Sequence, residues 1–103
     1  MNIEIVNIKI FDLAGSFAEN KDTAKDIREN YVLPAMKNGG NIILDYKGVD
    51  STTQSFTHAL ISEAIRIYGE DFFDKVKFKH CSESVKKIIV IVSDYMQQNL
   101  DNN

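Results

Sequence analysis

The sequence predicts a single α/β domain with a mixed β-sheet of about four strands and three helices, in β-α-β-α-β-α order. Three segments rich in Ile, Val and Leu have the spacing of strands, and each is followed by apolar residues at helical spacing. Strands that alternate with helices require at least one parallel crossover, with the helices packed against the sheet. The 103 residues are enough for one hydrophobic core and not for two. We therefore expect residues 1–103 to form one domain, with a polar tail from about residue 99.

The N-terminal part predicts a strand followed by a loop. Residues 2–11 alternate polar with apolar side chains, which indicates one long strand or two short ones. Residues 12–22 combine Gly, Ser, Asn and Asp without periodicity, so we expect them to form the longest loop of the chain.

The first helix is predicted from Thr23 to Asn38. Thr23 followed by Asp26 is typical of a helix N-terminus, and apolar residues then recur at spacings of three and four. Two glycines after Asn38 provide the stop. Pro34 lies inside this helix and is expected to kink it near the preceding turn.

The middle of the chain predicts a buried strand and a second helix. Residues 41–46 are short, apolar and β-branched, which is typical of a central strand covered on both faces. A turn-rich connection follows over residues 47–53. Ser51 with Gln54 three residues later predicts a capping box for a helix that ends at about Tyr68.

The last third predicts a link, an edge strand and a final helix. We expect residues 70–75 to be a short link, and residues 76–80 alternate apolar side chains with Lys, as an edge strand does. Ser82 is the predicted N-cap of the final helix. The helical interpretation is preferred over a strand because the large apolar residues fall in one arc. They are Val85, Ile88, Ile89, Val92, Tyr95, Met96 and Leu100.

Composition excludes several classes of function. A net charge of -3 and an isoelectric point near 5.3 provide no driving force for sequence-independent nucleic-acid binding. No apolar run reaches the ~18 residues of a membrane span, and the N-terminus lacks the basic region of a signal peptide. Cys81 is the single cysteine, which agrees with a reducing compartment. We expect a cytoplasmic protein.

Short motifs in the centre of the chain resemble a known family. A strand ending in Leu44 and Asp45, a loop with Gly48 and a helix start over residues 53–56 look like the centre of a STAS domain, the module of sulfate transporters and anti-sigma factor antagonists. The pattern is more similar still to a STAS-like family of bacterial proteins with no settled function, which also shares residues 32–36 late in the first helix. The resemblance extends over nearly the whole chain and implies a STAS-like fold.

The resemblance also implies a regulatory residue. In anti-sigma factor antagonists the second helix opens with an Asp-Ser-Ser-Gly motif, whose second Ser is phosphorylated by a partner kinase that is also the anti-sigma factor. These positions fall on residues 53–56, which makes Ser55 the implied phospho-acceptor. Thr53 and Phe56 depart from the motif. Because a bulky Phe beside the acceptor restricts access for a kinase, we expect Ser55 to serve mainly as a cap or contact residue.

The second helix offers two faces for interaction. Its apolar arc covers half the circumference, so that Ile61, Ile65 and Tyr68 either pack against a neighbouring helix or form a patch for a partner or a second copy. The opposite arc contains a row of small residues that ends in a cation: Ser55, Ala59, Ser62 and Arg66. Such a row would let another protein approach the helix closely.

Two chemical sites compete with these structural interpretations. Ser55, His58 and Asp45 have the residue types of a nucleophile, a base and an orienting acid, but Asp45 at a strand end more readily accepts loop N–H groups. His80 and Cys81 with His58 match no known zinc spacing. We therefore expect neither catalysis nor a metal or cofactor.

The function expected from the sequence is that of a protein-interaction module. The partner-binding residues lie at the start of the second helix and in the loop before it: Ser51, Thr52, Thr53, Ser55, His58, Ala59, Ser62 and Arg66. The resemblance implies an ATP-binding anti-sigma or histidine-kinase-like regulator as the partner, and a weak homodimer is a further option. The alternative function is a sensor of a small ligand or nucleotide, with its anion at the same helix N-terminus.

Overall fold

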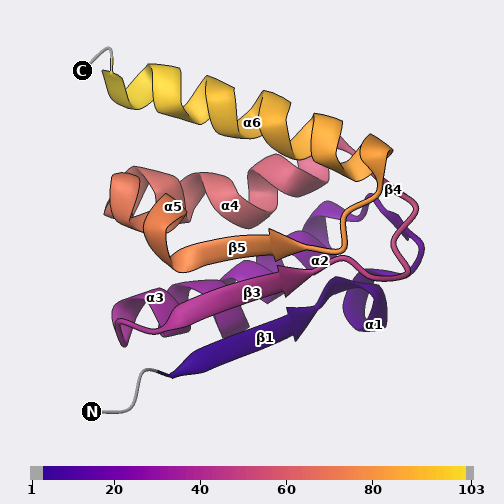
Figure 1. Cartoon of the computed structure of the whole chain (residues 1–103), viewed down its shortest axis with the longest axis horizontal. Helices are drawn as coiled ribbons and strands as arrows, with labels where there is room; N and C mark the ends of the chain where they lie inside the picture. The colour runs from indigo at the N-terminus through magenta and orange to yellow at the C-terminus, as the bar shows by residue number, and fades with distance from the viewer. Residues whose placement is uncertain (1–3, 102–103) are drawn as a thin grey trace.

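Three parallel strands form the main sheet, and helices cover one of its faces (Figure 1). The computed structural model describes residues 4–101, with side chains for residues 4–99. The strand order is β1-β3-β5, and a separate pair, β2-β4, is also parallel. The strands are β1 (Ile5–Lys9), β2 (Phe17–Ala18), β3 (Asn41–Asp45), β4 (Ser51–Thr52) and β5 (Val76–Lys79).

Helical segments connect these strands. They are α1 (Ile10–Ala14), α2 (Lys21–Ile27), the π-helical turn η1 (Arg28–Val32), α3 (Leu33–Lys37), α4 (Gln54–Tyr68), α5 (Glu70–Lys75) and α6 (Glu83–Asp101). Figure 1 shows α2 and α3 behind the sheet and α4 and α6 stacked beyond the β5 edge. None of the helices within residues 4–101 is both long and apolar enough to cross a membrane.

The predicted α/β class is confirmed, but the prediction of a mixed sheet of about four strands is wrong. Every pairing in the described chain is parallel, because each connection between paired strands passes through helices. β3 is the central strand and β5 an edge strand, as predicted. On β3, Ile42 and Leu44 are fully buried, whereas Ile43 on the opposite face is only partly buried. Within residues 4–101 one face of the sheet carries no helix, so the prediction that this strand is covered on both faces is wrong.

The N-terminal prediction needs two corrections. The strand ends at Lys9 instead of residue 11, because the chain turns directly into α1, which Gly15 terminates at a φ of 79°. The predicted loop over residues 12–22 is largely structured, since it holds the end of α1, β2 and the start of α2. Residues 2–3 of the predicted strand lie outside the described residues.

The first predicted helix is continuous but irregular. Asn20, and not Thr23, is its N-cap, because the Asn20 side chain accepts the N–H groups of Asp22 and Thr23 at 2.9 and 3.2 Å. The distortion expected before Pro34 takes the form of the π turn η1. Proline has no N–H to donate and its ring crowds the preceding turn, which a wider turn relieves.

The start of α4 also differs from the prediction. Thr53 is its N-cap and accepts the Phe56 N–H at 3.1 Å, so no capping box forms at Ser51. Ser51 and Thr52 instead pair with β2, and the Thr52 hydroxyl donates to the Ala18 carbonyl at 2.7 Å. The helix ends at Tyr68, as predicted.

The last third of the chain is mostly as predicted. Residues 70–75 form the helix α5 instead of a link, because acidic residues begin it and Phe72 anchors it in the core. Ser82 caps α6 by accepting the Val85 N–H at 3.1 Å. α6 extends to Asp101, beyond the expected start of a polar tail. Its buried face is narrower than the predicted arc, since Tyr95 is 56% exposed.

Candidate functional site

The N-terminus of α4 presents a short polar surface. Thr53 uses its hydroxyl to accept the Phe56 N–H, and Ser55 is exposed with its Oγ 3.3 Å from the Thr53 Oγ1. Phe56 is fully buried directly after Ser55 and anchors the first turn in the core. Ser55 is therefore held on the surface by a rigid neighbour.

A groove runs between this end of α4 and α6. It has a volume of about 320 Å³ and is lined by Gln54 and His58 from α4 and by Ile91, Val92 and Tyr95 from α6. Ile91 is 48% exposed, and the side chains that line the groove are mainly apolar except at the α4 end. The groove is thus an apolar feature at the edge of the predicted partner-binding residues.

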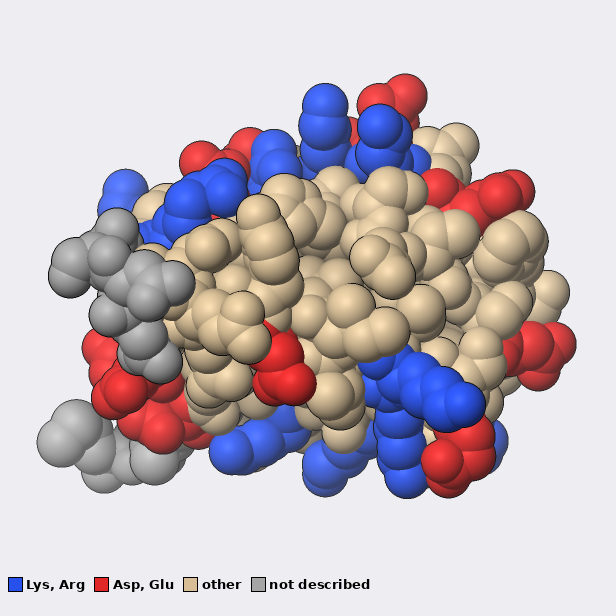
Figure 2. All heavy atoms as spheres, turned by 90° about the horizontal axis from the view of Figure 1, so that it is seen from above, with Lys and Arg blue, Asp and Glu red and all other residues tan. Residues whose placement is uncertain are grey.

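The apolar surface continues along α6. A second hollow of about 340 Å³ is lined by Glu83, Lys86, Lys87, Val90 and Ile91, so that Ile91 belongs to both. Figure 2, which looks down on α6, shows a broad band of uncharged residues with both basic and acidic residues along its borders. We call the exposed part of this region the α4–α6 surface, and it consists of Gln54, Ser55, His58, Val90, Ile91 and Tyr95.

The predicted partner-binding residues separate into three groups. Ser55, His58 and Arg66 are exposed, and Ser51, Thr53 and Ala59 are partly buried. Thr52 and Ser62 are buried, with exposures of 6% and 3%. The expectation that all of them line one accessible surface is therefore wrong for these last two residues.

The row of small residues on α4 serves internal packing. The Arg28 guanidinium donates from Nη1 to the Ala59 carbonyl at 3.2 Å, and its Nε lies 3.4 Å from the Glu63 carboxylate. The row therefore lets the α2–η1 segment approach, where a partner was expected. Ile61 and Ile65, considered above for a partner patch, are fully buried within the chain.

The carboxyl ends of the sheet hold a pair that the sequence did not reveal. Asp45 ends β3, and its Oδ1 accepts the Lys47 N–H at 3.0 Å and lies 2.9 Å from the His80 Nδ1. The Lys47 backbone hydrogen bond and the His80 side chain hold the pKa of Asp45 below its ordinary value of 3.8. Asp45 accepts a loop N–H group, as expected, but its histidine partner is His80 and not His58.

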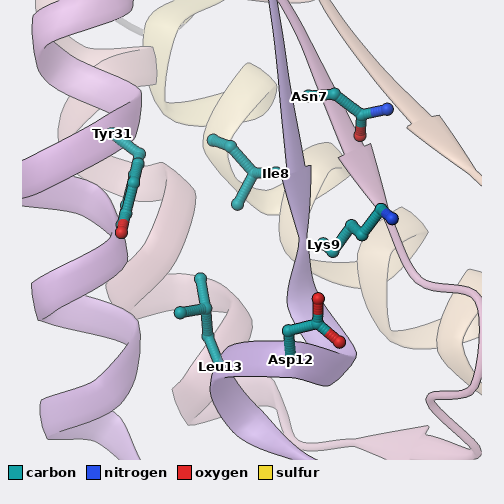
Figure 3. Close-up of a pocket in the computed structure, with 6 residues that line it drawn as sticks. All are labelled: Asn7, Ile8, Lys9, Asp12, Leu13 and Tyr31. Carbon is teal, nitrogen blue, oxygen red and sulfur yellow. The ribbon is translucent and has the colours of Figure 1, made fainter.

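Two hollows adjoin this pair and share Lys9 and Asp12. The first, of about 370 Å³, is lined by Lys9, Phe11, Asp12, Asp45, Lys47 and His80. The second, of about 290 Å³, lies between β1, α1 and η1. Figure 3 shows Lys9 and Asn7 turned away from Ile8, with Asp12 below Lys9 and Tyr31 across the hollow.

Ser55, His58 and Asp45 do not form the hydrogen-bonded triad considered above. Asp45 is bonded to His80, and His58 lines the groove with Tyr95. Cys81 is half-buried, and burial raises the pKa of its thiol. Among the side chains that the structure describes, no three His, Cys, Asp or Glu residues are grouped so as to hold a metal ion.

Two signals could have revealed the missed residues. Asp45 and His80 each end a predicted strand, and the ends of parallel neighbours meet at one sheet edge. Val90 and Ile91 fall outside the apolar arc of the final helix, and Val90 falls among its polar residues, which leaves two large aliphatic side chains on the solvent side of the helix. Both signals depend on how the strands and helices are placed relative to one another. The sequence predicted their order along the chain but not this placement in detail.

Comparison with known proteins agrees with the fold. A family model described as a STAS-like domain of unknown function (DUF4325) matches residues 23–86, more than half of the chain. No curated protein and no solved structure matches the chain. The matched region runs from the first turn of α2 to the start of α6 and includes β3, α4 and β5. The chain belongs to the family of STAS-like domains of unknown function.

Proposed function

We propose that this domain is a regulatory protein-interaction module that binds its partner through the α4–α6 surface. The observation that carries the proposal is the apolar groove in which Ile91 and Tyr95 lie exposed beside the N-terminus of α4. Adjoining apolar residues with a polar border are typical of surfaces that bind other proteins. The exposed residues expected from the sequence, Ser55 and His58, form the polar end of the same surface.

The energetics of such a surface favour a protein partner. Tyr95 combines a large apolar ring with a hydroxyl that stays hydrated, which is the type of side chain that anchors interfaces. Ile91 lies at the junction of the two hollows on α6, so that a partner side chain placed there would contact both. Binding would bury the apolar area of these two residues, which is exposed to water in the free domain.

The shape and charge of the surface favour an amphipathic helix as the docking element. A groove between two helices can hold the apolar stripe of a third, amphipathic helix, whose large apolar side chains recur every three or four residues. Lys86 and Lys87 border the second hollow, and Lys86 is paired with Glu83 at 3.7 Å, so that Lys87 is the cation left for an acidic residue at one end of the stripe. The family resemblance supports a partner of the ATP-binding anti-sigma or histidine-kinase-like class.

The alternative of an anion sensor at the start of α4 has less support. The Thr53 hydroxyl already accepts the Phe56 N–H, and Ser55 lies next to it, so the first turn is capped by its own chain. The apolar groove also offers little to a small anion. These two features favour a protein partner.

Affinity purification of tagged protein from its native host tests the proposal. Wild type is compared with Ile91→Asp, with Tyr95→Ala and with the matched control Tyr31→Ala, whose ring is 43% exposed on η1. We expect a co-purifying protein to be lost from the first two variants and retained by the control. A partner that is retained by Ile91→Asp and Tyr95→Ala, or lost only from Tyr31→Ala, would contradict the proposal.

A further inference from the structure

His80 has a backbone conformation that its residue type disfavours. Its φ of 59° is the only positive value for a non-glycine residue in the described part of the chain. The left-handed region is sterically unfavourable for residues other than glycine. This conformation follows directly on β5, and the ring reaches the Asp45 carboxylate at the end of β3. Disfavoured conformations of this kind concentrate at functional sites.

The hydrogen bond to Asp45 determines which nitrogen of the imidazole is available. An ionised carboxylate only accepts hydrogen bonds, so the His80 Nδ1 must carry the proton that it donates. The Nε2 is then free of this contact, and the side chain as a whole is 59% exposed.

Two lysines line the cavity that His80 borders. Lys9 ends β1 and Lys47 follows β3 by two residues, and both line the cavity of about 370 Å³ with His80. Within residues 4–99, neither lysine forms an ion pair. Asp12 and Asp45 are the acids of the lining, and Asp45 is hydrogen-bonded to the Lys47 N–H and to His80. The cavity lies outside the carboxyl ends of the strands, where side chains from separate chain segments converge.

The cavity also has an aromatic wall. Phe11 is 45% exposed and lines the cavity, and its ring rests against Gly48. A Cβ at Gly48, whose φ is 90°, would lie 3.1 Å from two ring carbons, so the ring and the glycine backbone are in close contact. The position of the ring is thereby restricted, and its exposed part borders the cations.

We propose that the cavity at the carboxyl ends of the sheet binds a small organic phosphate. Lys9 and Lys47 would hold the phosphate oxygens, and Phe11 would contact the apolar part of the ligand. The terminal oxygens of a phosphate monoester can accept from both lysines, which come from separate chain segments. His80, held by Asp45, borders the same cavity. This site is separate from the α4–α6 surface and does not depend on the proposed function.

Titration of the full chain with phenyl phosphate, followed by backbone amide NMR shifts, tests the proposal. We expect saturable shifts centred on the ends of β1, β3 and β5, and no saturable shift with phenol, which lacks the anion. Lys47→Gln and Lys9→Gln should each weaken binding about tenfold, the loss expected for one charge-assisted hydrogen bond.

Two further variants separate a specific site from general electrostatics. Lys77→Gln removes the same charge from the adjacent strand outside the cavity and should change affinity less than twofold. Asp12→Asn removes one of the two acids of the lining and should strengthen binding, which damage to the fold could not do. The proposal is overturned by an absence of saturable shifts with phenyl phosphate, by equal binding of phenol, or by equal losses in Lys77→Gln and Lys47→Gln. Shifts centred on the start of α4 would overturn it as well.

Discussion

The Nδ1 of His80 lies 2.9 Å from the Oδ1 of Asp45, and this contact joins the carboxyl ends of two neighbouring parallel strands, β3 and β5. The same carboxylate oxygen accepts the Lys47 N–H, so one acceptor orders both the strand ends and the turn between β3 and β4. Asp45 is only 14% exposed, whereas His80 is 59% exposed. The pair therefore has one fixed member and one that is accessible to solvent.

We predict a pH-dependent loss of stability for Asp45→Asn. The pKa of Asp45 is lowered in the folded state, first by the Lys47 N–H and then by His80, so the ionised form stabilises the fold above the unfolded value of about 3.8. The variant should lose no more than about 1 kcal/mol at pH 7, because solvent screens the exposed side of the pair. Urea denaturation at several pH values should show this difference disappear as the pH falls below 4. An equal loss at pH 7 and pH 3 would contradict the assignment.

Tyr46→Phe is predicted to stabilise the protein. The Tyr46 side chain is fully buried at the end of β3, and its hydroxyl has no hydrogen-bond partner among the described residues. Removal of a buried, unpaired hydroxyl should raise the free energy of unfolding by about 1 kcal/mol. Tyr31→Phe, at an exposed ring, should leave it unchanged, and both are measured by urea denaturation. A destabilised Tyr46→Phe would show that the hydroxyl has a partner in solution.

The buried tyrosine also predicts the response to alkali. Burial raises the pKa of Tyr46 well above its ordinary value of 10.0, so the folded state keeps its proton where the unfolded chain loses it. Wild type should therefore lose stability above about pH 10, and Tyr46→Phe should lose less. Denaturation curves at pH 8 and pH 11 compare the two. Parallel losses in both proteins would assign the effect to other groups.

Arginine substitutions on α4 should separate folding from binding. Ser62 is 3% exposed, so Ser62→Arg must bury a cation and should destabilise the fold by several kcal/mol. Ser55→Arg changes an exposed residue and should leave the melting temperature within a few degrees of wild type. Circular dichroism melting curves test both. A folded Ser62→Arg with wild-type stability would show that this side of α4 is open.

Ser55 is expected to remain unmodified in the cell. The fully buried Phe56 restricts the backbone beside its hydroxyl, where the related phosphorylated motif has Gly. Intact-mass analysis of protein from the native host measures this. A substantial species heavier by about 80 Da, mapped to Ser55, would show that the phospho-switch operates despite Phe56.

The elements with strong local signals were the ones that the sequence predicted well. The apolar run at residues 41–46 and the apolar arc of the final helix each predicted the right type of element, a central strand and a helix. The extent of burial was overestimated in both, because Ile43 is only partly buried and Tyr95 is exposed. β2 and β4 were missed because a two-residue strand shows no periodicity in the sequence. Each of them is defined only by its hydrogen-bonded pairing with the other. The helix over residues 70–75 was missed because six residues are too few to show a helical repeat.

The site was harder to predict than the fold because its residues come from distant parts of the chain. Asp45 and His80 are brought together by the register between β3 and β5, which no local pattern encodes. The burial of Ser62 depends on the helices that pack against α4, and the small residues that permit it look the same as a row left open for a partner. The start of α4 was predicted to within a few residues because hydroxyl side chains mark it locally, although the N-cap is Thr53 and not Ser51.

Photo-crosslinking in the native host tests the proposed interaction most directly. A benzoylphenylalanine replaces Tyr95 on the α4–α6 surface in one strain, and Tyr31 on η1 in another. Both tyrosines are exposed to a similar degree, at 56% and 43%, so the opportunity for random contact is comparable. We predict a discrete crosslinked protein from position 95 that Ile91→Asp abolishes, and none from position 31. A discrete product from position 31 alone, or the same product from both positions, would contradict the assignment of the α4–α6 surface as the interface.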